Sequence, residues 1–374
     1  MKGAHLKDTN NKKPTYYNPV YKEKFKYSGP DGAPRLLRRV RGSIGGNLLF
    51  PEGPTSANTA ETDVIKSFFN SVVSDNTNMC TMGIKDFYLG TPLPEGDKEY
   101  MWLDAVHFTP KIIADYHLQQ YVVPHNQSFR ILMKVCKTIY GLKNAGALSK
   151  RKLDNILSAG GYSEDPNVPC VYTHATNGVT FVLVVDDFCI KYTTSAGRDH
   201  LRQTLEQAYE VTLDPKGTKF VGLTITYNRN KRYLEISCPG YFAKVLKRFA
   251  HRNITPCATP MKYVPPDYGA HTQYATTDDT KDLTPAEVLE AQKIIGCILW
   301  HSRLIDAPTL SAVSKAATSL GDRKASLNAQ LDQLLGHLMA FPDNRVRFYA
   351  SDMILYSYSD RTCVKPSPEA APAV

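Results

Sequence analysis

The sequence lacks the features that mark membrane-spanning and disulfide-rich proteins. No apolar run approaches the roughly 18 residues that a membrane helix needs, and no signal peptide is recognisable. None of the eight cysteines forms a Cys-x-x-Cys pair, and no histidine stands at zinc-finger spacing from them. We therefore expect free thiols and an intracellular chain, cytoplasmic or nuclear, that is neither secreted nor bound to a membrane.

The chain does have an excess of positive charge on a globular composition. Lysine and arginine number 45 against 36 acidic residues, for a net charge of +9 and a pI of about 9.0. Hydrophobic residues make up 42% of the 374 residues, enough for about two or three subdomains with cores. The basic run Arg38–Gly42 contains Arg39 and Arg41, whose guanidinium forks could bind phosphates bidentately. A solvated charge run is the alternative, and the net charge favours an anionic partner without identifying it.

The most informative segment spans residues 179–192. β-branched and aromatic residues flank Asp186 and Asp187, which predicts two antiparallel strands at about 179–185 and 188–192. Carboxylates in so apolar a setting are costly unless a positive charge compensates them, and a divalent cation is the usual one. Because neighbours on a regular strand face opposite sides, a metal site here needs a further carboxylate from another segment. A polar hairpin tip without a metal explains the pair equally well.

Two further segments carry polar groups that could serve the same site. Met82–Leu89 combines an apolar strand with Asp86, the nearest candidate for the further carboxylate. A solvated Asp at a strand end is the alternative. Tyr140–Gly146 places two glycines around Asn144, which permits close approach of the backbone to a ligand. A plain strand–helix turn is equally consistent with that segment.

Taken in chain order, these segments resemble the motifs of the reverse transcriptase of copia-type LTR retrotransposons. The resemblance covers roughly residues 36–360 and rests on the joint order of the motifs. Asn144 stands where that family has Gln, and Val184 stands where it has Tyr. The motifs are Arg39-Val40-Arg41-Gly42, Gly83-Ile84-Lys85-Asp86-Phe87-Tyr88, Tyr140 to Gly146, Val184-Val185-Asp186-Asp187, Phe220-Val221-Gly222-Leu223, Ser237-Cys238-Pro239-Gly240-Tyr241 and Tyr356-Ser357-Tyr358-Ser359-Asp360.

The resemblance implies an α+β fold of the right-hand polymerase type, with fingers, a palm sheet, a thumb, a helical extension and a truncated ribonuclease H start. The implied domains, in chain order, are a poorly ordered lead-in at 1–34, fingers and palm at 35–240, thumb and helical connection at 241–344, the ribonuclease H-like start at 345–362 and a disordered tail at 363–374.

The resemblance also implies an activity: RNA-directed DNA synthesis by two-metal nucleotidyl transfer with Mg²⁺ or Mn²⁺. The implied partners are an RNA or DNA primer–template and dNTPs. The residues it assigns are Asp186 as metal ligand, Asp187 as its support, Tyr88 as the gate against the ribose 2′-hydroxyl, Arg39 and Arg41 as holders of the incoming phosphates, and Asn144 in the nucleotide site.

One position departs from the family pattern. Gly83 stands where the family has the Asp that ligates both metals, and Asp86, three residues on, faces the opposite side of a regular strand. We therefore expect an impaired polymerase. The first alternative is a non-catalytic nucleic-acid-binding remnant of the same fold. The second is an unrelated basic interaction protein, which predicts no Asp-Asp hairpin beside residue 83.

Overall fold

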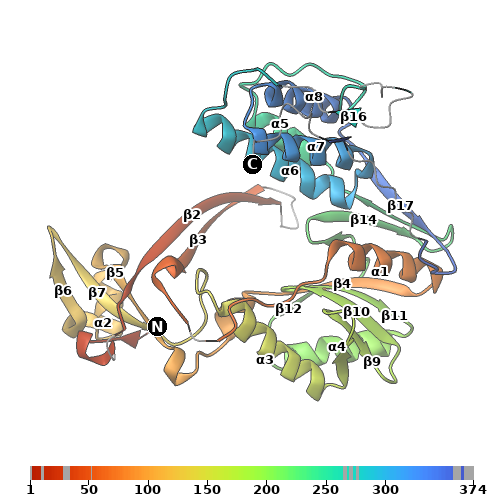
Figure 1. Ribbon diagram of the computed structural model, residues 1–374. Helices are drawn as coiled ribbons and strands as arrows, with labels where there is room; N and C mark the ends of the chain where they lie inside the picture. The colour runs from red at the N-terminus through yellow and green to blue at the C-terminus, as the bar shows by residue number, and fades with distance from the viewer. Residues whose placement is uncertain are drawn as a thin grey trace. The chain divides into compact units, whose positions relative to one another are not determined.

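The computed structural model describes residues 2–9, 12–27, 34–51, 53–263, 268, 273–274, 278–356 and 364–365. The fold is mixed α and β, and the chain divides into two compact units. The first unit contains residues 1–60 and 80–215, and the second contains residues 61–79 and 216–374. Figure 1 labels helices and strands of both units.

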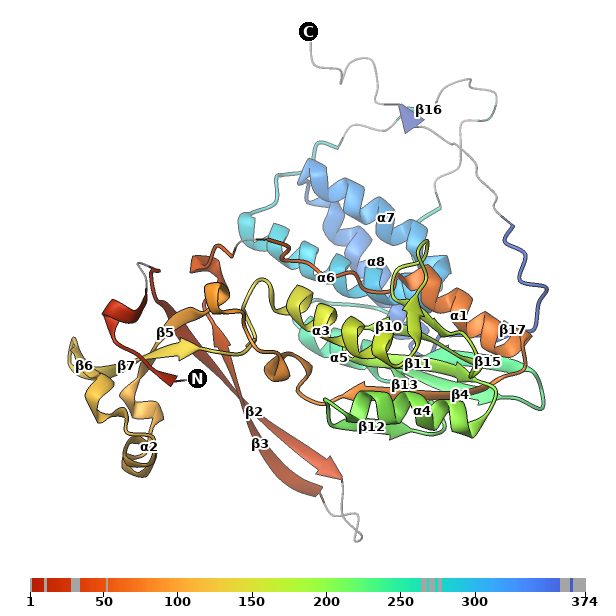
Figure 2. The same cartoon turned by 90° about the horizontal axis from the view of Figure 1, so that it is seen from below.

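One sheet of the first unit is built around a long ribbon. Its strand order is β1-β7-β5-β2-β3, with β6 paired to the outer part of β7. Figure 2 shows β2 and β3 running as a two-stranded ribbon away from β5, β6 and β7. The strands are β1 (Lys2–Gly3), β2 (Thr15–Tyr27), β3 (Pro34–Ile44), β5 (Glu99–Asp104), β6 (Val122–His125) and β7 (Ser128–Val135).

The ribbon corrects the expectation that residues 1–34 are poorly ordered. Thr15–Tyr27 pairs antiparallel with Pro34–Ile44, with Tyr17 opposite Ile44 and Lys22 opposite Arg39. Tyr21 and Val40 are 67% and 55% exposed, so this middle part of the ribbon is held by the hydrogen bonds between the strands and not by a buried face. Among the described side chains of the ribbon, burial is confined to the end at Thr15 and Ile44, which are 2% and 3% exposed, so the sequence carries little alternation of apolar and polar residues to reveal such a strand.

The second sheet of the first unit carries the Asp-Asp hairpin. Its order is β12-β4-β11-β10-β9-β8. Helices α3 (Ala145–Ala159) and α4 (Ser195–Glu206) lie side by side against this sheet (Figure 1) and bury the side chains of Leu153 and Leu201 completely. The strands are β4 (Asn78–Ile84), β8 (Tyr162–Glu164), β9 (Val171–His174), β10 (Val179–Val184), β11 (Asp187–Tyr192) and β12 (Val211–Asp214).

Short helical segments connect these elements. They are α2 (Pro110–Asp115) and the 3₁₀ helices Leu6–Thr9 (η1), Gly46–Leu48 (η2), Phe87–Gly90 (η3), Glu95–Asp97 (η4), Ala105–His107 (η5) and Leu118–Tyr121 (η6).

The second unit combines a helical bundle with a four-stranded sheet, β13-β14-β15-β17, on which α1 packs through the Phe69 ring. The bundle buries one apolar cluster from its four helices. Thr284 and Glu287 form a capping box at the start of α6. The helices are α1 (Thr62–Ser74), α5 (Tyr241–Arg248), α6 (Pro285–Leu304), α7 (Ala307–Asp322) and α8 (Ser326–Ala340), and the strands are β13 (Lys219–Phe220), β14 (Leu223–Asn228), β15 (Tyr233–Ser237), β16 (Gln273–Tyr274), β17 (Arg345–Tyr349) and β18 (Val364–Lys365).

The units do not follow the domain limits expected from the sequence. The expected limit at 240/241 falls inside the second unit, which also takes α1 from an earlier part of the chain. Strand β17, at the expected ribonuclease H start, pairs with β15. Asp360, the first carboxylate of that start, lies outside the described residues. Among the described residues, no helix combines the length and apolar character needed to cross a membrane.

Candidate active site at the Asp-Asp hairpin

The predicted hairpin is present, with its tip at Asp186. Val184 pairs with Asp187, which leaves Val185 and Asp186 as a two-residue turn. Asp186 therefore lies in the turn, and Asp187 is the first residue of β11. The two carboxylates therefore stand at the tip between the two apolar arms, as predicted, and not side by side on one regular strand. Behind them, Phe181 and Phe188 are completely buried, which fixes the hairpin in the sheet.

Gly83 lies on the strand next to this hairpin, as predicted. Strand β4 is the neighbour of β11, and the Ile84 N–H donates a 3.0 Å hydrogen bond to the Asp186 carbonyl. A Cβ placed on Gly83 would lie 3.5 Å from Oδ1 of Asp187 and 3.2 Å from Oγ1 of Thr212. A side chain at position 83 would therefore face Asp187 across the sheet, and the hydroxyl of Thr212 would crowd it.

Asp86 turns toward an arginine of the ribbon. Its backbone is left-handed, with φ 49° and ψ 38°, because the chain leaves β4 here and enters η3. Its Oδ1 is 3.4 Å from Nη2 of Arg39, and both side chains are 43% exposed. An ion pair this exposed contributes about 0–1 kcal/mol to stability. Asp86 thus has a partner on β3.

Arg41 is the positive group near Asp186. Its guanidinium stacks over the ring of Tyr140 at 5.4 Å, and that ring meets Tyr88 edge-on at 6.0 Å. Burial raises the pKa of Asp186, and its own backbone N–H and the charge of Arg41 oppose that rise. Burial also raises the pKa of Tyr88, and the charge of Asp186 adds to the rise. Arg41, Tyr88, Tyr140 and Asp186 therefore share one electrostatic environment.

The two arginines border a groove of about 420 Å³, here called the arginine groove. Arg39 and Arg41 are two residues apart on β3, so both side chains leave the same face of the strand. The remaining lining residues are Tyr17, Val40, Gly42, Asp86, Leu89, Ile139 and Tyr140.

Asn144 is buried at the start of α3, with 4% of its surface exposed. Its Oδ1 has no hydrogen-bond partner among the described residues, and its side chain does not cap the helix. A buried amide oxygen without a donor is costly, which makes this atom a candidate for contact with a ligand or a water molecule. Asn144 is absent from the lining of the arginine groove.

The carboxylates do not assemble into a site for two cations. The part of the chain that the structure describes contains no group of three or more Asp, Glu, His or Cys that could hold a metal ion. Position 83, which faces Asp187, offers no side-chain oxygen, and the Asp86 carboxylate lies against Arg39. Because Mg²⁺ takes about six oxygen ligands, including carboxylates of the protein, these residues do not fit the two-metal centre that the resemblance implies.

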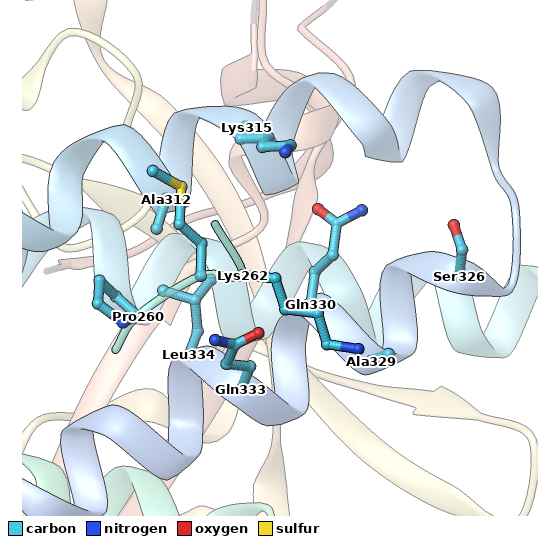
Figure 3. Close-up of a pocket in the computed structure, with 10 residues that line it drawn as sticks. Pro260, Lys262, Ala312, Lys315, Ser326, Ala329, Gln330, Gln333 and Leu334 are labelled. Atoms are coloured by element: carbon cyan, nitrogen blue, oxygen red, sulfur yellow. The ribbon is translucent and has the colours of Figure 1, made fainter. Parts of the chain in front are cut away.

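A separate hollow of about 300 Å³ lies in the second unit, between α7, α8 and residues 260–262 (Figure 3). Its lining includes Lys262, Lys315, Gln330 and Gln333 around apolar side chains, and no carboxylate among the described residues. The Gln333 amide donates to both the carbonyl and the hydroxyl oxygen of Thr259, which ties the 259–262 segment to α8. None of the residues predicted to form the active site lines this hollow.

Sequence reasoning missed two residues of the hairpin site. Thr212, on β12, donates from its hydroxyl to the Gly83 carbonyl at 3.0 Å and borders the space where a side chain at 83 would go. Tyr140 supplies the ring between Arg41 and Tyr88. Thr212 carries no signal in the sequence because it reaches the site only through strand pairing. Tyr140 is the first residue of the predicted Tyr140–Gly146 turn, in which the sequence pointed to the glycines and to Asn144.

Comparison with known proteins supports the reverse-transcriptase resemblance. Residues 100–263 match the family model described as reverse transcriptase (RNA-dependent DNA polymerase). The match includes the Asp-Asp hairpin but neither Gly83 nor the arginines of β3. The retrovirus-related Pol polyprotein from transposon TNT 1-94 of Nicotiana tabacum is 28% identical over 134 residues, which are 35% of this chain and 10% of that polyprotein. The matched part thus spans about a tenth of the relative. These matches confirm the resemblance to copia-type retrotransposon reverse transcriptases.

Two solved structures are similar at low scores. A foamy viral protease-reverse transcriptase in complex with double-stranded DNA has a TM-score of 0.40 and 12% identity, and the match covers 87% of this chain and 43% of that one. Telomerase from Candida albicans, in complex with a fragment of telomeric RNA, has a TM-score of 0.32 and 11% identity, and the match covers 91% of this chain and 63% of that one. Both similarities are distant.

Proposed function

We propose that this chain is a primer–template-binding protein of the reverse-transcriptase type whose polymerase activity is impaired at position 83. The fold would be that of a right-hand polymerase, with the hairpin sheet as palm and the β2–β3 ribbon in the fingers. Arg39 and Arg41 would contact phosphates from the arginine groove, because guanidinium forks suit phosphate oxygens. Tyr88 would border the sugar, and Asn144 the nucleotide.

One observation carries the proposal: position 83 faces Asp187 and is Gly. Asp186 and Asp187 supply carboxylates from one hairpin only, whereas two cations beside substrate phosphates require oxygens from more than one segment. Losing a transition-state-stabilising ligand costs several kcal/mol, which is a factor of about 10³ or more in rate. We therefore expect little or no primer extension with Mg²⁺ or Mn²⁺.

The test is to restore the carboxylate together with the space that it needs. Because a Cβ at position 83 would lie 3.2 Å from Oγ1 of Thr212, Gly83→Asp alone is crowded. The variants are Gly83→Asp, Thr212→Ala, and the double variant Gly83→Asp/Thr212→Ala, each assayed for primer extension and for duplex binding. Extension should rise in the double variant above the level of either single variant. The matched control, Gly83→Asn in the Thr212→Ala background, has nearly the same shape without the charge and should not extend.

The outcomes separate the enzyme from the remnant. Robust extension by the unmodified chain would overturn the impairment and point to Asp86 as the working ligand. If no variant extends but all bind duplex, the chain is a non-catalytic nucleic-acid-binding remnant, the second candidate, which the absence of a carboxylate at 83 also favours. Failure of every form to bind nucleic acid would overturn both candidates.

A further inference from the structure

The hollow between α7, α8 and residues 260–262, here called the α7–α8 hollow, has the lining of a ligand site that the proposed function does not use. All of its lining residues belong to the second unit. Ala312 and Leu334, which are 3% and 1% exposed, reach it from the core of the helical bundle, and Pro260, Met261 and Ala329 add apolar surface. Small-molecule sites have volumes of about 300–1,000 Å³ and mostly apolar linings with a few polar groups. At about 300 Å³, this hollow meets both conditions.

The wall formed by residues 260–262 is built into the bundle. The Cys257 N–H donates to the Gly336 carbonyl at 3.2 Å, and the Cys257 thiol donates to the Gln333 carbonyl at 3.1 Å. A Cβ on Gly336 would lie 2.2 Å from the Thr255 carbonyl oxygen, so the chain comes this close to α8 only because position 336 is glycine. Together with the bonds from the Gln333 amide to Thr259, these contacts fix the path that leads to the wall.

Most polar side chains of the α7–α8 hollow already have partners. The oxygen and the nitrogen of the Gln330 amide each lie 3.4 Å from Oγ of Ser319. The Gln333 amide is bound to the wall segment, as described above. The Ser326 hydroxyl donates to the carboxylate of Asp278, which does not itself line the hollow. These groups therefore stabilise the bundle and do not need a ligand to complete their hydrogen bonds.

Two lysines are the polar groups that remain. Lys315 belongs to α7 and Lys262 to the wall segment, so the two charges come from different elements (Figure 3). Neither forms a hydrogen bond or an ion pair with any residue that the structure describes. The hollow thus combines an apolar lining with positive charge that no described carboxylate of the lining offsets.

We propose that the α7–α8 hollow binds an apolar anion, a carboxylate carried on a compact aromatic or alkyl body. The body would contact Met261, Ala312 and Leu334, because burial of apolar surface stabilises a complex. The flexible Met261 side chain can adapt to the shape of the body. The carboxylate would lie near Lys262 and Lys315, whose ammonium groups act as point charges for anions. A neutral ligand leaves both charges unused, and a cation is repelled by them.

The test follows the Met261 methyl group by NMR, with 2-naphthoate as the probe. The chain has eight methionines, and Met261 lines the hollow, so its methyl resonance, assigned with Met261→Leu, reports binding at this place. Titration of the unmodified chain should shift this resonance with a Kd of about 0.1–1 mM, as expected for a ligand of that size. The neutral analogue 2-naphthol should bind about 4- to 25-fold more weakly, and the cationic 2-naphthylmethylammonium should cause no shift.

Matched variants separate the charge from the apolar lining. Replacing Lys262 and Lys315 together by Gln should weaken 2-naphthoate by about 2- to 5-fold for each lysine, the contribution of an exposed ion pair, and leave 2-naphthol unchanged. Lys293→Gln removes an exposed lysine of α6 outside the hollow and should have no effect. Ala329→Phe fills the hollow from an exposed position of α8 and should weaken both ligands.

Three results would overturn the inference. The first is a Met261 resonance that does not respond to 2-naphthoate, and the second is equal binding of 2-naphthoate and 2-naphthol. The third is a Met261 resonance that shifts with protein concentration alone, which would show that a second copy of the chain covers the hollow. Because none of these measurements uses nucleic acid, their outcome does not depend on the proposed function.

Discussion

Two arginines of β3 supply the positive charge that the acidic residues of the candidate site need. Arg39 pairs with Asp86 at 3.4 Å, and the charge of Arg41 acts on Asp186. In a metal-dependent site, bound cations would compensate the negative charge of the carboxylates. Here the charge of Arg41 only partly opposes the effect of burial on the pKa of Asp186, and the pair between Arg39 and Asp86 is exposed. A phosphate that enters the arginine groove would therefore compete with Asp86 for Arg39.

A second residue-scale feature is a buried histidine in the helical bundle. His301 is 1% exposed, its ring lies 4.2 Å from the Phe242 ring, and its Nδ1 has no partner among the described residues. Burial lowers the pKa of His301 to about 4, and the charge of Asp306 only partly opposes this. The neutral ring is therefore the form that the folded state accommodates.

This histidine predicts a pH-dependent stability. The pKa of His301 in the folded state lies below its ordinary value of about 6.5. The free energy of unfolding therefore keeps its full value above pH ~6.5 and decreases as the pH falls toward 4, because the unfolded state then binds a proton that the folded state does not. The loss should reach about 3 kcal/mol at the acid end. His301→Phe should remove this part of the pH dependence of the free energy of unfolding, measured by denaturant unfolding between pH 4 and 7. The exposed control His117→Asn should keep it, and equal slopes in all three proteins would contradict the assignment.

At the scale of elements, the strands and helices that bury an apolar face could be predicted from the sequence. The arms of the hairpin are rich in β-branched and aromatic residues, and both strands form where expected. Helix α1 begins after Glu61 with no side-chain cap. Strand β2 was missed because most of its side chains from Tyr16 to Glu23 are exposed and the strand is ordered by its hydrogen bonds with β3.

The hairpin turn itself is strained. Val185 has φ of 59°, a value that β-branched residues avoid, and it is the first central residue of a two-residue turn in which Gly is preferred. Val185→Gly should therefore stabilise the protein by about 1 kcal/mol, the relief of strain exceeding the added freedom of the unfolded chain. Val184→Gly, one residue earlier in the strand, should destabilise it. Thermal melts by circular dichroism distinguish the two, and a lower melting temperature for Val185→Gly would show that the turn is not strained.

At the scale of the whole molecule, sequence order alone could not predict the two units. Residues 61–79 join the second unit although both flanking segments belong to the first. The sequence motifs Gly83, Asp186 and the turn after Tyr140 were predicted to share one region, and all three lie in the first unit. These motifs come together because strands from distant parts of the chain pair with one another. The resemblance to a known family can suggest such pairing, whereas the local periodicity of the sequence cannot.

The net charge of +9 leads to the last prediction, which concerns binding to primer–template duplex. We expect micromolar-range affinity that falls by about 100-fold between roughly 50 and 200 mM salt if about four phosphates are contacted, because neutralised phosphates release counterions. Replacing Arg39 and Arg41 by Gln should lower the slope of log affinity against log salt by about 2.

The chain offers a closely matched control for those arginines. Arg345 and Arg347 are also two residues apart on an exposed strand, but both bind Glu235, at 3.1 and 2.7 Å. Replacing them by Gln changes the net charge equally and should leave the salt slope unchanged, because the pairs with Glu235 are shorter than the exposed 3.4 Å pair of Arg39 with Asp86 and give way less readily to a phosphate. Equal effects of the two double variants would mean that net charge alone governs binding and that the arginine groove has no special part in it. An affinity independent of salt would contradict phosphate contact altogether.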